Sequence, residues 1–280
     1  MVRMLRIAAA VPVLLALAAP PARAQSLMVA SPAVVIDDRS RTGALTLIND
    51  GIAPVEVSVS SFCGYPVTDS IGRMYLRTFE AVDDTMPCAA RWIQSFPRRL
   101  RIEAKSRATI RLLVTPPPGL PRREYWARIV VSAKGGHVSV GNLADNTAIQ
   151  ATLDLEVRSV VGLFYRPAAL HTGVVLDRLR GEVVGDSLVG RALLTRQGDA
   201  AFVGSLRIEL RDTAGAVRSR AQVPLGVYYS LEPRFALPVS GLPPGSYQLL
   251  VEAVSSRPDL APDALLQTLP VRQAVAVMLP

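Results

Sequence analysis

The chain has 280 residues and a formal net charge of +8 at pH 7. The charge is mild and the arginines are scattered among expected strands, which does not favour a nucleic-acid partner. The 22 prolines and 19 glycines are spread between β-branched runs, a composition typical of many short strands joined by turns.

The first residues have the features of an export signal. Arg3 and Arg6 precede an apolar run from Ile7 to Ala19, and Ala22-Arg23-Ala24 follows it. A run this short, with a basic flank and a small-x-small exit, is typical of a secretory signal and not of a membrane span. We expect a signal peptide over residues 1–24 and a soluble, exported, non-membrane-spanning protein of two middle-sized domains.

The only two cysteines, Cys63 and Cys88, lie in the first half of the chain. In an oxidising exported compartment, such a pair is more often a disulfide than a metal or redox site. A disulfide closing a loop of this length stabilises a fold by roughly 3 kcal/mol. We expect a Cys63–Cys88 disulfide, and the alternative is two separate buried thiols.

From Ile149 to Arg158, apolar and polar residues alternate. Successive side chains of a strand point to opposite faces, so this segment predicts a long strand with one apolar and one polar face. An ordinary strand that covers its own core alternates in the same way, so alternation alone does not say what the apolar face contacts. The apolar positions are Ile149, Ala151, Leu153, Leu155 and Val157.

The predicted strand runs into Leu163-Phe164-Tyr165-Arg166-Pro167. This ending resembles the domain junction of the PapD-like periplasmic pilus chaperones, where a long strand closes the first immunoglobulin-like domain and an FYRP segment opens the second. Trp92-Ile93 and Leu120-Pro121 are similar to further segments of the same first domain. The resemblance implies an all-β fold of two immunoglobulin-like sandwiches, residues 25–164 and 165–280, the second of them divergent.

In that family the strand is lent to an incomplete pilus subunit, which is donor-strand complementation. The resemblance therefore implies an exported pilus or fimbrial-type subunit as partner and an outer-membrane usher as a further candidate. An exposed apolar edge is also prone to pair with itself, so we expect self-association along this strand. The FYRP arginine of the family forms an inter-domain salt bridge at the positions of Glu124 and Arg166. By position, the donor residues would be Ile149, Ala151, Leu153, Leu155 and Val157.

The sequence departs from the family at two cations that grip the terminal carboxylate of the subunit. The lysine position is Gly162, and the arginine position falls on Ala33 or Val34. Arg158 lies on the polar face of the strand, where long side chains extend to water. Subunit binding would then rest on backbone pairing and on apolar burial, at about 1.5 to 3 kcal/mol for each aliphatic side chain.

Other strands are expected throughout the chain. Leu27–Ile36 predicts a first strand in which Pro32 forces an edge or a bulge, the segment between the cysteines predicts a hairpin or loop insertion, and the glycine-rich residues 134–147 predict a loop. After Pro167, short strands are expected at residues 174–177, 188–195, 204–210, 221–225, 235–237 and 247–254.

One segment of the sequence resembles an enzyme motif, but the motif is incomplete. Gly185-Asp186-Ser187-Leu188 matches the nucleophile block of the GDSL esterases, but the histidine that would activate the serine should follow it, and His137 and His171 both precede it. We interpret this block as a turn leading into a strand. Neither histidine has neighbours at ligand spacing, so the sequence predicts no metal site and no cofactor.

The sequence thus predicts a periplasmic, non-enzymatic protein. The leading hypothesis is an atypical chaperone that caps an exported subunit by strand addition. The alternative is a structural or adhesive immunoglobulin-like protein of the cell envelope without chaperone activity.

Overall fold

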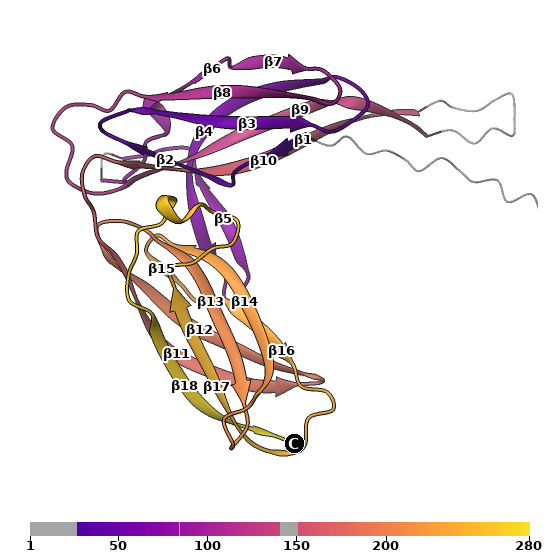
Figure 1. Cartoon of the computed structure of the whole chain (residues 1–280), viewed down its shortest axis with the longest axis vertical. Helices are drawn as coiled ribbons and strands as arrows, with labels where there is room; N and C mark the ends of the chain where they lie inside the picture. Colours follow the sequence, from indigo (N-terminus) through magenta and orange to yellow (C-terminus); the bar gives the residue numbers. More distant parts are fainter. Residues whose placement is uncertain (1–26, 84, 141–150) are drawn as a thin grey trace, which may run out of the picture.

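The computed structural model describes residues 27–83, 85–140 and 151–280, and within them all side chains except those of 135–140 and 151–155. Apart from the 3₁₀ turns η1 (Ala90–Trp92) and η2 (Pro262–Ala264), every element of these ranges is a β-strand. The strands form four sheets, two built by β1–β10 and two by β11–β18. They pack as two sandwiches that meet at an elbow (Figure 1). The predicted all-β fold of two immunoglobulin-like sandwiches is confirmed.

The two sheets of the first sandwich enclose one core. Valines at alternate positions of β4, Val55, Val57 and Val59, are buried against leucines of the facing sheet, such as Leu45 and Leu47. One sheet has the order β1 (Leu27–Val29), β3 (Thr42–Asn49), β8 (Ser106–Val114), β6 (Ile93–Phe96). The other has the order β2 (Ala33–Asp37), β10 (Ala151–Arg166), β9 (Tyr125–Val140), β4 (Val55–Thr68), β5 (Met74–Phe79), with β7 (Arg99–Ile102) also on β4.

The expected first strand, Leu27–Ile36, is divided at Pro32. Its first part, β1, pairs antiparallel with β3 in one sheet, and its second part, β2, pairs parallel with β10 in the other. Proline has no N–H to give to a ladder and fixes its own φ, so the chain leaves one sheet there and joins the next. This crossing places β2 beside the end of β10.

The prediction of a loop over residues 134–147 is wrong for its first part, because β9 continues to Val140. Gly135 and Gly136 belong to this strand. Both face the single residue Leu155 of β10, where the register between the two strands shifts. Two residues opposite one is a β-bulge, a position that glycine tolerates well. The remaining residues of the expected loop, 141–147, lie outside the described residues.

The insertion between the cysteines is a hairpin, as predicted. β4 continues beyond its pairing with β9 and pairs with β5 from Cys63 to Thr68. Cys63 and Cys88 form a disulfide, which ties the root of this hairpin to the segment before η1.

The second sandwich has a sheet of β11, β12, β15 and β16 that faces a sheet of β14, β13, β17 and β18. Most expected strands are present and longer, but β18 was not expected, because the run Ala274–Met278 is apolar on both faces and shows no alternation. The bounds are β11 (Thr172–Val184), β12 (Ser187–Gly198), β13 (Phe202–Arg211), β14 (Val217–Val227), β15 (Ser230–Leu231), β16 (Arg234–Pro238), β17 (Gly245–Val254) and β18 (Val271–Leu279).

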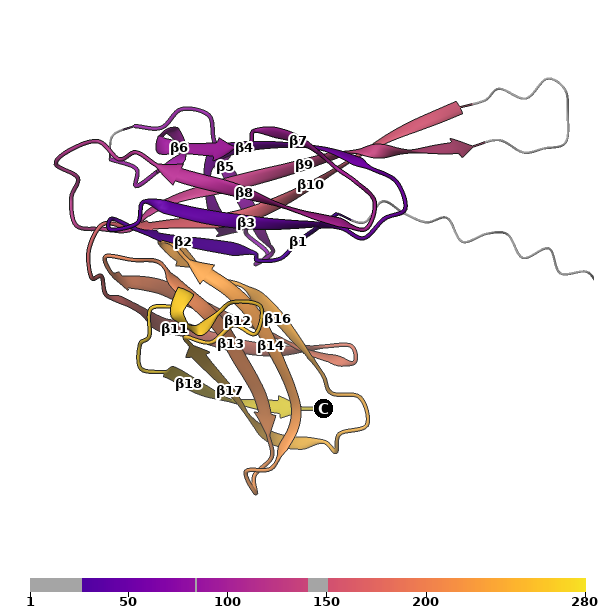
Figure 2. The same ribbon diagram turned by 45° about the horizontal axis from the view of Figure 1, so that its top comes forward.

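Two features of the first sandwich define the surfaces discussed below. β9 and β10 project beyond the other strands as a two-stranded arm (Figure 2). The β4–β5 hairpin extends from the same sheet toward the second sandwich (Figure 1). No helix among the described residues is long and apolar enough to cross a membrane.

Candidate partner-binding edge

β10 has two different neighbours along its length. β9 pairs with it from Ala151 to Tyr165, whereas β2 covers its other side only from Gly162 to Arg166. In the part of the chain that the structure describes, no strand pairs with that second side between Ala151 and Val161. We call this stretch the open edge of β10. Unpaired backbone groups along such an edge are a template for an added strand.

A hydrogen bond just before the beginning of β2 shows which backbone groups face the open edge. The N–H of Gly162 donates to the carbonyl oxygen of Pro32 at 2.9 Å, on the β2 side of the strand. Backbone groups alternate between the two sides of a strand, so the N–H groups of Arg158 and Val160 face that same side. Those of Ser159 and Val161 face β9 instead.

The core-facing side of β10 passes from buried to exposed along the strand. Val161 and Leu163 are 1% and 0% exposed and belong to the core of the first sandwich. Val157, on the same face and closer to the arm, is 43% exposed. The apolar face therefore continues past the point where the sandwich can cover it.

The predicted donor residues are distributed along this arm. Val157 is the one whose side chain the structure describes. Ala151, Leu153 and Leu155 lie in β10 and their backbones pair with β9 or face its bulge, but their side chains lie outside the described residues. Ile149 lies outside the described residues altogether.

The other end of β10 is held by a buried ion pair. The Nε of Arg166 donates to Glu124 Oε1 at 2.8 Å, and the side chains are 11% and 0% exposed. Glu124 Oε2 accepts two more hydrogen bonds, from Trp126 Nε1 at 2.8 Å and from the backbone N–H of Ala201 at 3.0 Å. Since Ala201 belongs to the second sandwich, this carboxylate joins β9, β10 and both domains.

An aromatic cluster surrounds the ion pair. Trp126 and Phe164 of the first domain pack with Tyr228 of the second, and all three are buried. The ring centroids of Trp126 and Tyr228 are 4.6 Å apart with an edge-to-face orientation, which aromatic pairs prefer. Burial raises the pKa of the Tyr228 hydroxyl, and the nearby Arg128 guanidinium partly opposes this.

Arg128 is a buried cation that the sequence interpretation missed. It lies directly opposite Gly162 in the β9–β10 ladder and is 8% exposed. Its Nε donates to the carbonyl oxygen of Gly64 at 3.0 Å, and its guanidinium carbon lies 4.9 Å from the ring centre of Tyr228. Its Nη2 is buried and has no hydrogen-bond partner in the described structure.

Gly162 explains how the guanidinium fits there. A Cβ at this position would lie 2.9 Å from Arg128 Nη1, so the missing side chain leaves the space that Arg128 occupies. Ala33, one of the two candidates for the absent arginine, pairs with Gly162. The positive charge at this corner thus comes from β9. Neither an arginine in an alternating strand nor a glycine in a neighbouring strand gives this signal alone, because their pairing depends on the register between β9 and β10.

Tyr165 fixes the end of β2 against β10. Its hydroxyl donates to Asp38 Oδ1 at 2.6 Å. Burial, followed by the Asp38 carboxylate, raises the pKa of Tyr165 to about 12. The same hydrogen bond, together with Arg41, lowers the pKa of Asp38.

No protein-family model matches the chain, and no curated protein does either. The chain is similar in fold to solved chaperones. The YadV chaperone is 16% identical, over 89% of this chain and 99% of that one, with a TM-score of 0.45. The CsuC chaperone, bound to the tip subunit CsuE of Acinetobacter baumannii Csu pili, is 15% identical over 89% and 97%, with a TM-score of 0.44. The SafB chaperone, in complex with the SafA pilin of Salmonella enterica, is 16% identical over 89% and 96%, with a TM-score of 0.42.

The esterase-like block has the structure of a turn. Gly185 adopts a positive φ of 57° between β11 and β12, and Ser187 is the first residue of β12. His171 lies beside the other end of β12, where Thr172 pairs with Gly198. At about 3.3 Å per residue, the length of β12 separates Ser187 and His171 by roughly 35 Å, so this histidine cannot activate the serine. The side chain of His137 lies outside the described residues.

Proposed function

We propose that this protein is a periplasmic chaperone that holds an exported pilus or fimbrial-type subunit by adding the open edge of β10 to the subunit as a strand. The observation that carries the proposal is the open edge itself, where Val157 is exposed and the N–H groups of Arg158 and Val160 face no strand of the described structure. Backbone pairing would supply affinity, and pockets for alternate side chains would supply specificity.

Apolar burial would contribute much of the binding. Each aliphatic side chain that passes from water into a subunit groove contributes about 1.5 to 3 kcal/mol. Val157 supplies one such side chain. Ala151, Leu153 and Leu155 follow it along the same strand, and Ile149 extends the series.

Arg128 is the group that we assign to fix the register of the added strand. A buried guanidinium nitrogen without an acceptor is costly, and a carboxylate is the acceptor that arginine binds best. Arg128 lies opposite Gly162, where the open edge ends and β2 begins. A terminal carboxylate of the subunit would provide the acceptor that Nη2 lacks once the residues that cover this buried nitrogen move aside.

The test uses two substitutions at one exposed position. Arg158→Pro removes a backbone N–H from the open edge and leaves the N–H groups that face β9 unchanged, since proline is tolerated where an edge N–H faces solvent. Arg158→Ala keeps that N–H and removes the same side chain. Tagged forms of both and of the wild type are recovered from the periplasm of the native host, and the co-purifying exported proteins are identified by mass spectrometry.

The expected result is an exported subunit that is held by the wild type and by Arg158→Ala and is lost with Arg158→Pro. Sedimentation of the purified proteins shows whether the same edge also pairs with itself. Recovery of the same subunit in equal yield with Arg158→Pro would contradict strand addition, as would recovery of no exported subunit with the wild type.

A further inference from the structure

The β4–β5 hairpin is a second connection between the two domains. Up to Phe62, β4 belongs to the first sandwich and pairs with β9. From Cys63 to Thr68 it pairs with β5, and the hairpin that they form runs alongside the second sandwich (Figure 1). The disulfide to Cys88 holds the hairpin at its root.

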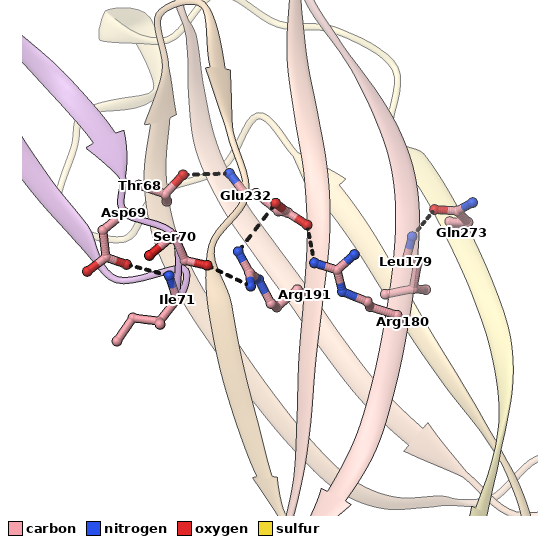
Figure 3. Close-up of polar contacts among 9 residues, drawn as sticks. All are labelled: Thr68, Asp69, Ser70, Ile71, Leu179, Arg180, Arg191, Glu232 and Gln273. Atoms are coloured by element: carbon pink, nitrogen blue, oxygen red, sulfur yellow. Dashed lines mark hydrogen bonds and ion pairs between the residues drawn. The ribbon is translucent and has the colours of Figure 1, made fainter.

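The tip of the hairpin is hydrogen-bonded to the second domain (Figure 3). The backbone N–H of Glu232 donates to Thr68 Oγ1 at 3.0 Å, and Arg191 Nη1 donates to the carbonyl oxygen of Ser70 at 3.0 Å. The N–H of Arg234 donates to the carbonyl oxygen of Gly72 at 2.8 Å. These bonds reach three successive parts of one turn, so they hold its position and its orientation.

The charged side chains next to the hairpin tip, Glu232 and Arg191, are held in place by further hydrogen bonds. Glu232 accepts from Arg180 Nη2 at 2.7 Å and from Arg191 Nη2 at 3.3 Å (Figure 3). Arg191 thus links the carboxylate of its own domain to the carbonyl of Ser70. Within the tip, Asp69 Oδ1 accepts from the N–H of Ile71 at 3.0 Å, which stabilises the turn.

The fit of the tip is close. Gly72 has a φ of +83°, and a Cβ built on it would lie 2.8 Å from the Cβ of Arg234. At the root, Tyr65 stacks on Phe79 and on Tyr228, with centroids 5.1 and 6.0 Å apart. The contact between the hairpin and the second domain therefore extends from root to tip.

We propose that this hairpin is a strut that fixes the angle between the two domains. The covalent junction and the Glu124–Arg166 pair lie at one corner of the elbow, and contacts at one corner leave rotation about it possible. From Cys63 to Thr68 the hairpin reaches roughly 17 Å beyond its root, at about 3.3 Å per residue. A second attachment at that distance blocks the rotation, so the elbow has one opening and does not act as a hinge.

The first experiment removes the tip in the full-length protein. Residues 68–74 are replaced by Asn-Gly, which closes a two-residue hairpin between Val67 and Tyr75, a pair in register. Spin labels are placed on unnatural amino acids at the exposed positions Arg107 and Ala274, one in each domain. Double electron–electron resonance then gives the distribution of distances between the domains.

We expect one narrow distance in the wild type and a broader, shifted distribution in the truncated protein, with an unchanged far-ultraviolet circular dichroism spectrum. A folded truncated protein with the wild-type distribution would overturn the strut.

The second experiment compares two glycines that have nearly the same φ but different surroundings. Gly72 and Gly215 have φ values of +83° and +81°, so alanine strains both turns alike. A Cβ at Gly215 meets nothing within 4 Å, whereas one at Gly72 meets Arg234. Gly72→Ala should shift the inter-domain distance and Gly215→Ala should not. Equal distributions in the two variants would overturn the proposal even if the truncated protein failed to fold.

Discussion

At the scale of single residues, Glu124 connects β9, β10 and the second domain through one carboxylate. Its two carboxylate oxygens accept from Arg166, Trp126 and the backbone of Ala201. A buried carboxylate is stable only when its oxygens are paired in this way. Arg166 also donates, through Nη2, to the carbonyl oxygen of Ala264 at 3.1 Å, so its loss affects both domains.

Arg166→Ala should therefore be strongly destabilising. Removing one partner leaves a buried charge without compensation, which costs about 3 to 5 kcal/mol. The control is Arg158→Ala, which breaks an exposed pair with Glu156, and exposed pairs contribute less than about 1 kcal/mol. Urea unfolding of both variants measures the difference. Equal free energies of unfolding for the two variants would show that the junction pair is not structural.

Tyr165 gives a pH-dependent contribution. Below its usual pKa of 10.0, the tyrosine is protonated in the folded and the unfolded chain, so its stabilisation is fully present. Between this value and about 12 the unfolded chain loses the proton while the folded chain keeps it, so stability falls as pH rises. Tyr165→Phe should make the fall shallower, with a remainder from Tyr228 and Tyr229, whose pKa values are also raised by burial. Urea midpoints on both sides of pH 10 test this, with Tyr75→Phe, an exposed tyrosine, as the control. An unchanged slope in Tyr165→Phe would refute the assignment.

At the scale of elements, β10 shows what alternation predicts and what it leaves open. The pattern from Ile149 to Arg158 predicts the strand, but not its surroundings, because a strand that covers its own core and a strand that projects from it alternate alike. Gly135 and Gly136 mark the arm only when they are placed opposite Leu155 in the ladder. The split of the first strand follows from Pro32, whereas the sheet that each half joins depends on distant pairing.

Two valines on one face of β10 should respond oppositely to a charge. Val157→Glu should fold with near-native stability, because Val157 is exposed, whereas Val161→Glu should lose about 3 kcal/mol or more by placing an unpaired carboxylate in the core. Thermal denaturation compares them. Val217→Glu, on an exposed valine of β14, should leave subunit capture unchanged while Val157→Glu weakens it. A strongly destabilised Val157→Glu would mean that the edge is covered.

At the scale of the whole molecule, some contacts at the elbow between the domains could be predicted from the sequence and others could not. Glu124 and Arg166 could be matched only through the resemblance at the FYRP segment, since they lie 42 residues apart. Arg128 and the contacts of the hairpin tip depend on how the domains are placed against each other. Turn and strand patterns describe each domain separately, so these contacts could not be predicted from the sequence.

The buried interface between the domains should make them unfold together. Calorimetry of the wild type should show one transition. Tyr228→Ala removes the ring that contacts Trp126, Phe164 and Tyr65, at a cost of about 3 to 5 kcal/mol, and should separate the transition into two. Tyr75→Ala, at an exposed tyrosine of β5, should keep one transition. Two transitions in the wild type would contradict the coupling of the domains.

Strand addition at the open edge is tested most directly by hydrogen exchange at individual backbone amides. In the free protein, the N–H groups of Arg158 and Val160 should exchange rapidly, while those of Ser159 and Val161, which face β9, should be protected. Binding of the co-purified subunit should protect Arg158 and Val160. A subunit that binds tightly and leaves these two amides unprotected, or a free protein in which they are already protected, would contradict the account.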